Sequence, residues 1–128
     1  MASKLNSSSK QILVLDDDPL VLRSLEMVLK RHQYNCLCAS SAEEAILHAR
    51  AKDLDLIISD IRMSGKDGVE AMSEIRSIFK REGKKDIPII FITGYSHDAL
   101  LMNAEGIGEI ILKPFDLDRF MMTVREYL

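Results

Sequence analysis

Polar residues follow four short apolar segments of the sequence, and each is of a type that binds phosphate or metal. The four transitions are 12–15 into Asp16 and Asp17, 56–59 into Asp60, 89–92 into Thr93, and 110–112 into Lys113. If the segments are neighbouring parallel strands, their ends lie along one edge of a sheet, where open α/β sheets bind ligands. The pattern therefore predicts a fold and a site together.

Three of these residues are aspartates, and their charges predict a metal ion. At an effective dielectric constant of about 20, two carboxylates about 4 Å apart repel by about 4 kcal/mol. A cluster of Asp16, Asp17 and Asp60 therefore needs protons or a cation to compensate it. Oxygen ligands suit Mg²⁺, whereas zinc would call for histidine or cysteine, and neither follows a neighbouring strand.

The same residues could carry out phosphoryl transfer. A carboxylate beside Mg²⁺ can attack phosphorus and form an acyl phosphate. The transferred phosphoryl group carries its charge on three equatorial oxygens. We expect one oxygen to face Mg²⁺, a second to pair with the Lys113 ammonium group, and the third to accept a hydrogen bond from the Thr93 hydroxyl.

The rest of the sequence predicts the elements that would hold these residues. Expected strands are 11–16, 34–39, 55–60, 87–93 and 108–112, and expected helices are 19–31, 41–51, 66–81, 96–104 and a last one capped by Asp116. This alternation predicts an α/β fold, with helices on both faces of a parallel sheet. Right-handed crossovers favour a doubly wound, flavodoxin-like sheet of order 2-1-3-4-5, whose first and third strands meet at the switch point.

Local signals support several boundaries. Asp18 before Pro19 suits a helix N-cap, which is a simpler interpretation of Asp18 than a metal contact. Ser41 and Glu44 have the spacing of a capping box. The strand at 34–39 is the least apolar and is expected at an edge, whereas the other four are apolar enough to be covered on both faces.

The composition is that of one globular domain. The chain has 128 residues and a net charge of −3, so it offers no broad basic surface for nucleic acid or anionic membrane. Residues 1–10 predict a disordered tail ahead of a domain at 11–128, and no apolar stretch is long enough to span a membrane. Cys36 and Cys38 would point to one face of a strand, either as small buried side chains or as ligands of a shared soft metal.

With these motifs in place, the chain resembles the receiver domains of two-component response regulators. The resemblance covers residues 11–128 and rests on four motifs in order, which are Asp16-Asp17, the segment DIRMSGKDG at 60–68, Thr93-Gly94 and Lys113-Pro114-Phe115. It implies that Asp60 accepts a phosphoryl group from a histidine of a sensor kinase or phosphotransfer protein.

The resemblance also implies a role for each site residue. Asp17, Asp60 and the Arg62 carbonyl oxygen would bind Mg²⁺ directly, and Asp16 would act mostly through water. Thr93 and Lys113 would hold the phosphoryl oxygens. The Lys113-Pro114 peptide is expected to be cis, which the residue type permits.

Phosphorylation would change partner binding at the face made by the fourth helix, fifth strand and fifth helix. A phosphorylation-linked homodimer is one possible result, and the expected location is cytoplasmic. No direct contact with nucleic acid or membrane is expected of this domain. The downstream target or output domain is left open.

Several positions depart from the usual receiver pattern. Ser64 stands where proline is usual. Ile110 stands where an aromatic ring usually moves with the threonine, so that movement is expected to be absent or altered here; the alternative is that Ile110 simply packs under the last two helices. Arg62 and Tyr95 would flank the site, and they either shield the acyl phosphate from water or lie in solvent without effect.

Two other functions fit parts of the sequence. Residues 13–18 also resemble the first motif of haloacid-dehalogenase-type phosphatases, which have a nucleophilic aspartate and an acid/base aspartate two residues later. Those enzymes need a further acidic pair on a strand after the lysine, whereas only a helix is expected after Lys113, and Asp60 would have no role. A receiver-like binding module without phosphorylation is disfavoured because such proteins usually lack one of the acidic or lysine positions. We therefore expect a signalling domain that catalyses only its own phosphoryl uptake and loss.

Overall fold

The structure is a computed structural model, and it describes residues 9–63, 65–94 and 100–128, without the side chains of residues 100–102. Strands and helices alternate along these residues. The strands are β1 (Gln11–Leu15), β2 (Asn35–Ala39), β3 (Leu56–Asp60), β4 (Ile89–Thr93) and β5 (Glu109–Leu112). The helices are α2 (Pro19–Arg31), α3 (Ala42–Ala51), α4 (Gly68–Arg81), α5 (Leu100–Glu105) and α6 (Leu117–Tyr127).

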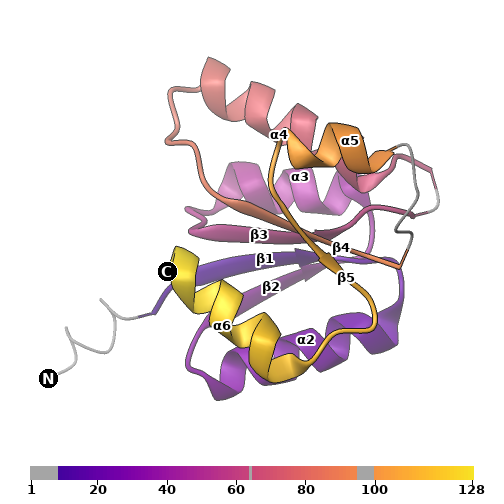
Figure 1. Cartoon of the computed structure of the whole chain (residues 1–128). Helices are drawn as coiled ribbons and strands as arrows, with labels where there is room; N and C mark the ends of the chain where they lie inside the picture. Colours follow the sequence, from indigo (N-terminus) through magenta and orange to yellow (C-terminus); the bar gives the residue numbers. More distant parts are fainter. Residues whose placement is uncertain (1–8, 64, 95–99) are drawn as a thin grey trace, which may run out of the picture.

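All neighbouring strands of the sheet run parallel, in the order β2-β1-β3-β4-β5. Helices α2 and α6 cover one face, and α3, α4 and α5 cover the other (Figure 1). The predicted doubly wound, flavodoxin-like fold is therefore confirmed. β1 and β3 lie side by side at the switch point, which is where this class of sheet forms its ligand crevice.

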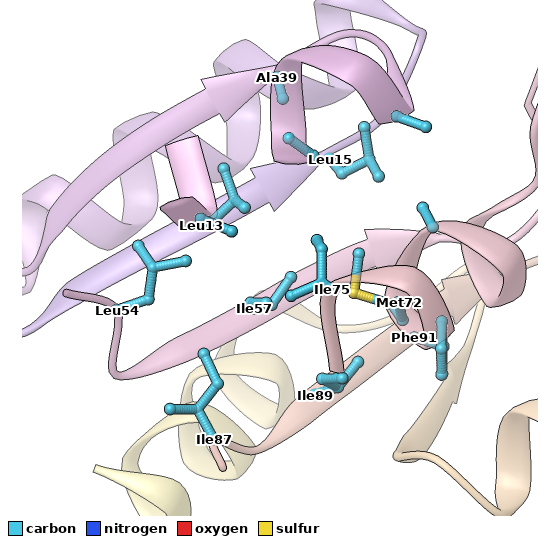
Figure 2. Close-up of a cluster of buried hydrophobic side chains, with 14 of the residues drawn as sticks. Leu13, Leu15, Ala39, Leu54, Ile57, Met72, Ile75, Ile87, Ile89 and Phe91 are labelled. Atoms are coloured by element: carbon cyan, nitrogen blue, oxygen red, sulfur yellow. The ribbon is translucent and has the colours of Figure 1, made fainter. Parts of the chain in front are cut away.

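Two apolar clusters, one on each face of the sheet, hold the layers together. Successive strand residues point to opposite faces, so each of the central strands contributes to both clusters. On one face Leu13 and Ile57 pack with Met72 of α4, as Figure 2 shows. On the other face Ile12 and Ile58 belong to the cluster that includes the buried side chains of α2 and α6. β3 and β4 are buried along their whole length and β1 is buried from Ile12 onward, so the carboxyl ends of all three strands are held by packing on both faces.

Helix α4 begins at Gly68, whereas the sequence had indicated a start at Lys66. The Asp67 side chain accepts a hydrogen bond from the Glu70 N–H (2.9 Å), and the Glu70 side chain accepts one from the Asp67 N–H (3.3 Å). This is a complete capping box, and it places the helix start directly after Asp67. The loop that follows Asp60 is therefore longer than predicted.

The capping box expected for α3 forms only in part. The Ser41 side chain accepts from the Glu44 N–H at 3.1 Å, so Ser41 is the N-cap. The Glu44 carboxylate, however, accepts from the Ser40 N–H at 2.7 Å, one residue before the predicted partner. The side chains of Ser41 and Glu44 therefore both still accept hydrogen bonds from backbone N–H groups around the start of the helix.

The two edge strands differ from the central ones in burial. β2 is half-buried, as expected of an edge strand. β5 was expected to be covered on both faces, and that expectation is wrong: Glu109 is exposed and the Leu112 residue is 46% exposed. Because β5 has a neighbour on one side only among the described strands, its outer edge stays in contact with solvent.

Some predictions fall outside the described residues. The start of the helix expected at 96–104 is one of these, and the described part of that helix is α5. The disordered tail is another, since residues 1–8 are not described; the Lys10 carbonyl already accepts a hydrogen bond from Asn35 (2.8 Å). The division into tail and domain stays a prediction. Within the described part of the chain, no helix has the length and apolar character needed to cross a membrane.

Candidate functional site

The sheet brings the predicted site residues to one edge. Asp16 directly follows β1, Asp60 ends β3, Thr93 ends β4, and Lys113 directly follows β5. The parallel registers align these four strand ends beside one another. Residues far apart in the sequence therefore converge at the carboxyl edge because each follows a buried strand.

Asp16, Asp17 and Asp60 form an acidic cluster. One carboxylate oxygen of each lies within 4.8 Å of the corresponding oxygens of the other two. Asp16 (3% exposed) and Asp60 (9% exposed) are buried, whereas Asp17 is exposed. Among the described residues, this is the one group of three or more His, Cys, Asp or Glu side chains that could share a metal ion. The cluster is open to solvent on the side of Asp17.

Lys113 approaches both buried aspartates. Its Nζ lies 3.8 Å from Asp16 Oδ2 and 3.9 Å from Asp60 Oδ1, so the lysine sits between them. Backbone groups orient both carboxylates: the Asp18 N–H donates to Asp16 Oδ1 and the Ile61 N–H donates to Asp60 Oδ1, each at 2.9 Å.

Burial raises the pKa of both buried aspartates. For Asp60, loss of solvent is the largest cause, the charge of Asp16 adds to it, and the pKa rises to about 6 in spite of Lys113. For Asp16, burial again raises the pKa, while the Asp18 N–H and Lys113 oppose the rise. One lysine does not compensate the cluster, and this is the environment that a bound divalent cation stabilises. The residues present therefore fit Mg²⁺, which prefers oxygen ligands.

We predict that, without divalent metal, the free energy of unfolding rises as the pH is lowered from about 7 to 5. The folded-state pKa of Asp60, about 6, lies above the ordinary value of 3.8, so the folded protein binds the proton more tightly. This stabilising contribution is complete below about pH 3.8 and is lost as the pH rises through about 6. Above that range, Asp60→Asn should raise the free energy of unfolding by about 2 kcal/mol and remove most of the pH dependence.

Urea denaturation in EDTA at a series of pH values measures this effect. Asp53→Asn is the matched control, because Asp53 is exposed and lies beyond the opposite end of β3. The control should follow the wild type at every pH. A wild type that loses stability between about pH 7 and 5, or an Asp60→Asn variant that is less stable than the wild type at neutral pH, would contradict the prediction.

The loop after Asp60 is held against β3 by two residues that the sequence interpretation missed. The buried Ser59 hydroxyl donates to the Asp60 carbonyl oxygen at 2.7 Å. The Gly68 N–H donates to the Ile61 carbonyl oxygen at 2.8 Å. A Cβ at Gly68 would lie 1.8 Å from the Asp60 carbonyl oxygen, so only glycine permits this approach. The available signals were a serine inside an apolar strand and a glycine directly after the helix cap Asp67.

A cavity of about 450 Å³ opens over the acidic cluster. Its lining residues are Asp16, Asp17, Asp18, Asp60, Arg62, Gly94 and Lys113. Asp18 lies at its rim and caps α2 by accepting from the Leu20 N–H at 2.9 Å, which confirms the interpretation of Asp18 as a cap. Arg62 also lines the cavity, whereas Tyr95 and Ser64 lie outside the described residues. The shielding role of Arg62 and Tyr95 stays a prediction.

Thr93 differs from the other site residues because it is fully buried and does not line the cavity. Its carbonyl oxygen accepts a hydrogen bond from the Lys113 N–H at 2.7 Å, which ties the ends of β4 and β5 together. The Lys113-Pro114 peptide is cis, as predicted. Ile110 is half-buried and packs against the apolar cluster that contains Ala104 of α5. Ile110 is therefore a packing residue in this structure.

Comparison with known proteins finds the same combination of fold and motifs elsewhere. Residues 12–125 match the family model of the response regulator receiver domain. The transcriptional regulatory protein YvrH of Bacillus subtilis is 36% identical over 120 residues, which are 91% of this chain and 48% of that protein. The transcriptional regulatory protein ZraR of Klebsiella oxytoca is 32% identical over 119 residues, which are 91% of this chain and 26% of that protein. The chain thus spans half or less of the length of these relatives.

Solved structures agree with these matches. The response regulator TrrA of Thermotoga maritima, in complex with Mg²⁺-BeF, superposes with a TM-score of 0.79 at 34% identity, covering 93% of this chain and 99% of that one. The chemotaxis protein CheY4 of Vibrio cholerae superposes with a TM-score of 0.83, covering 94% of this chain and 100% of that one. At 23% identity, CheY4 supports the fold alone.

Proposed function

The chain belongs to the family of response regulator receiver domains, and on this premise we propose that Asp60 is the phosphoacceptor of a two-component system. The phosphoryl group would come from a phosphohistidine of a sensor kinase or phosphotransfer protein. The observation that carries the proposal is the position of the Asp60 carboxylate, which lies at the switch-point edge beside a second buried aspartate and Lys113. It also lines an open cavity that a phosphohistidine side chain could enter.

We propose that Asp17, Asp60 and the Arg62 carbonyl oxygen hold Mg²⁺, with Asp16 acting mostly through water. The closeness of the three carboxylates and the raised pKa values of the two buried ones support this assignment. Mg²⁺ held there would neutralise the carboxylates and the charge of the incoming phosphoryl group. The exposed Asp17 lies on the side from which ion and donor would approach.

In the proposed reaction, a carboxylate oxygen of Asp60 attacks phosphorus and forms an O–P bond. The N–P bond of the phosphohistidine breaks, and the electron pair returns to the imidazole ring, which takes a proton from solvent. The Lys113 ammonium group, already 3.9 Å from Asp60, would pair with one phosphoryl oxygen. The Thr93 hydroxyl would donate to another, and because Thr93 is buried it must turn toward the cavity to do so.

We propose that the acyl phosphate changes the binding of a target at the face made by α5, β5 and α6. Exposed side chains with large apolar parts on this face support an interaction surface there: Leu112 lies at the end of β5, and Tyr127 of α6 donates a hydrogen bond to Glu109 of β5. The target is either a separate protein or an output domain, since the relatives are longer and are named as transcriptional regulators. A phosphorylation-linked homodimer through the same face, and a cytoplasmic location, belong to this proposal.

Incubation with Mg²⁺ and acetyl phosphate tests the phosphoacceptor assignment. Intact-mass spectrometry should show a gain of one phosphoryl group per wild-type chain and no gain for Asp60→Asn. Asp53→Asn, which leaves the cluster intact, should take up one group like the wild type. Phosphorylation of the Asp60→Asn variant to the wild-type extent, or its absence from the wild type, would contradict the proposal.

Counting the phosphate released separates this function from that of a haloacid-dehalogenase-type phosphatase. A receiver domain takes up one phosphoryl group and releases it slowly, whereas a phosphatase hydrolyses many equivalents of a phosphomonoester. In the phosphatase interpretation the nucleophile would precede α2, and Asp60→Asn would leave turnover largely intact. We expect no multiple turnover with phosphomonoesters.

A further inference from the structure

We propose that Cys36 and Cys38, at the open edge of β2, form a two-thiol binding site for a soft monovalent cation such as Cu⁺. The site is separate from the phosphoacceptor cluster and uses different chemistry. Thiolate sulfur is a soft ligand that selects Cu⁺, whereas the aspartate cluster suits Mg²⁺. The proposal does not depend on the function assigned to Asp60.

The two thiols lie on the same face of the strand. Residues two apart along a strand point to the same side, with their Cα atoms about 6.6 Å apart. Here that side faces α2, because Cys36 packs against the cluster that contains Leu25 and Val28. Both are free thiols that are half-buried, and the charge of Cys38 acts on Cys36. The pair is therefore placed so that both sulfurs can bind one ion.

The strand position makes the pair accessible. β2 is the first strand of the sheet order and pairs with β1 alone among the described strands. Solvent therefore reaches the thiols along the outer edge of the sheet, and no strand has to separate for an ion to enter. Figure 1 shows β2 at this edge, next to α2.

Charged side chains of α2 complete the site. Glu26 and Lys30 form an ion pair of 3.1 Å one helical turn apart. The charges of Glu26 and Lys30 act on both thiols, which places the ion pair beside the two cysteines. Two thiolates with one monovalent cation carry a net charge of −1, and the Lys30 ammonium group is positioned to balance it. Glu26 offers an acceptor for a departing thiol proton.

The number of ligands favours a two-coordinate ion over zinc. Structural zinc sites use four ligands, and among the described residues the cysteines are not part of any group of three or more clustered metal-binding side chains. Two thiolates alone complete the coordination of a two-coordinate d¹⁰ monovalent ion. Burial raises the pKa of both thiols, so binding must displace two protons, and the balanced step is M⁺ + 2 RSH giving M(SR)₂⁻ + 2 H⁺.

Titration of the reduced protein with Ag⁺, a redox-inert probe for Cu⁺ sites, tests the proposal. The buffer is free of chloride and oxygen, and it contains excess imidazole to suppress binding by the three histidines. Native mass spectrometry should show one Ag⁺ per chain, and a pH-stat should record two protons released. Cys36→Ser and Cys38→Ser should each weaken binding by about 100-fold, because one thiol cannot chelate.

A matched control variant keeps two thiols in β2 but places them on opposite faces of the strand. In the double variant Leu37→Cys/Cys38→Ser the thiols at positions 36 and 37 point to opposite faces of β2. Circular dichroism checks that the variant is folded, and its affinity for Ag⁺ should fall to that of the single-thiol variants. Wild-type affinity in the double variant, or independent binding of two Ag⁺ ions by the wild type, would overturn the proposal.

Discussion

Lys113→Met should lower the initial rate of phosphoryl uptake from acetyl phosphate by about 100- to 1,000-fold. Two effects act in the same direction. The variant lacks the ammonium group that would pair with the phosphoryl oxygen as charge develops. It also lacks the charge that opposes the raised pKa of Asp60, so a proton competes more strongly with Mg²⁺ for the attacking carboxylate at neutral pH.

Initial rates at several pH values separate these two effects. Raising the pH above the pKa of Asp60 should restore only the part of the loss that comes from protonation. Lys85→Met is the control, because Lys85 is exposed and lies near the amino end of β4, away from the site. Unchanged uptake by Lys113→Met at neutral pH would show that the lysine has no part in the transfer.

Gly68→Ala should lower the free energy of unfolding by about 3 kcal/mol, which is large for the addition of one methyl group. The added Cβ would lie 1.8 Å from the Asp60 carbonyl oxygen and 2.9 Å from Ser59 Oγ. The closest atom belongs to the backbone, so a side-chain rotation cannot relieve the contact. The start of α4 or the peptide after Asp60 has to move, and we expect phosphoryl uptake to fall as well.

Urea denaturation in EDTA and in Mg²⁺ measures the loss of stability. Gly106→Ala is the matched control, because the nearest atom to its added Cβ is the Asn103 carbonyl oxygen at 3.7 Å, an ordinary contact. Its stability should stay within about 0.5 kcal/mol of the wild type. Removal of Ser59 Oγ in a Gly68→Ala/Ser59→Ala double variant should give no recovery. Recovery there would mean that the hydroxyl, not the backbone, limits the site.

The fold followed from the sequence because its signals are local and agree with one another. Continuous apolar runs mark the buried strands, and three- and four-residue spacing marks the helices between them. The start of α4 was misplaced by two residues although Asp67 and Glu70 carry the spacing of a capping box, so that signal was present in the sequence. The exposure of β5 was different, because it depends on which elements pack beside the strand in the folded sheet, and no short segment encodes that.

The sequence predicted which strand ends meet at the candidate site, but it did not predict how buried each side chain is or which way it faces. A parallel sheet brings its carboxyl ends together whatever residues they carry, so the convergence of Asp16, Asp60 and Lys113 follows from topology. The topology does not determine whether a particular side chain faces the cavity. Thr93 is fully buried below it, and the close contact between Gly68 and the Asp60 carbonyl arises only when the loop folds back.

Lys113 directly follows β5. Of the three neighbouring strands β3, β4 and β5, β5 is the one whose side chains are most exposed. A protein that docks on the exposed outer edge of β5 would remove water from Leu112, the residue immediately before that lysine. Thermodynamic reciprocity then applies: if phosphorylation of Asp60 strengthens such docking, the docked protein must favour phosphorylation by the same factor. A target would in this way increase the equilibrium fraction of the phosphorylated form that recruits it.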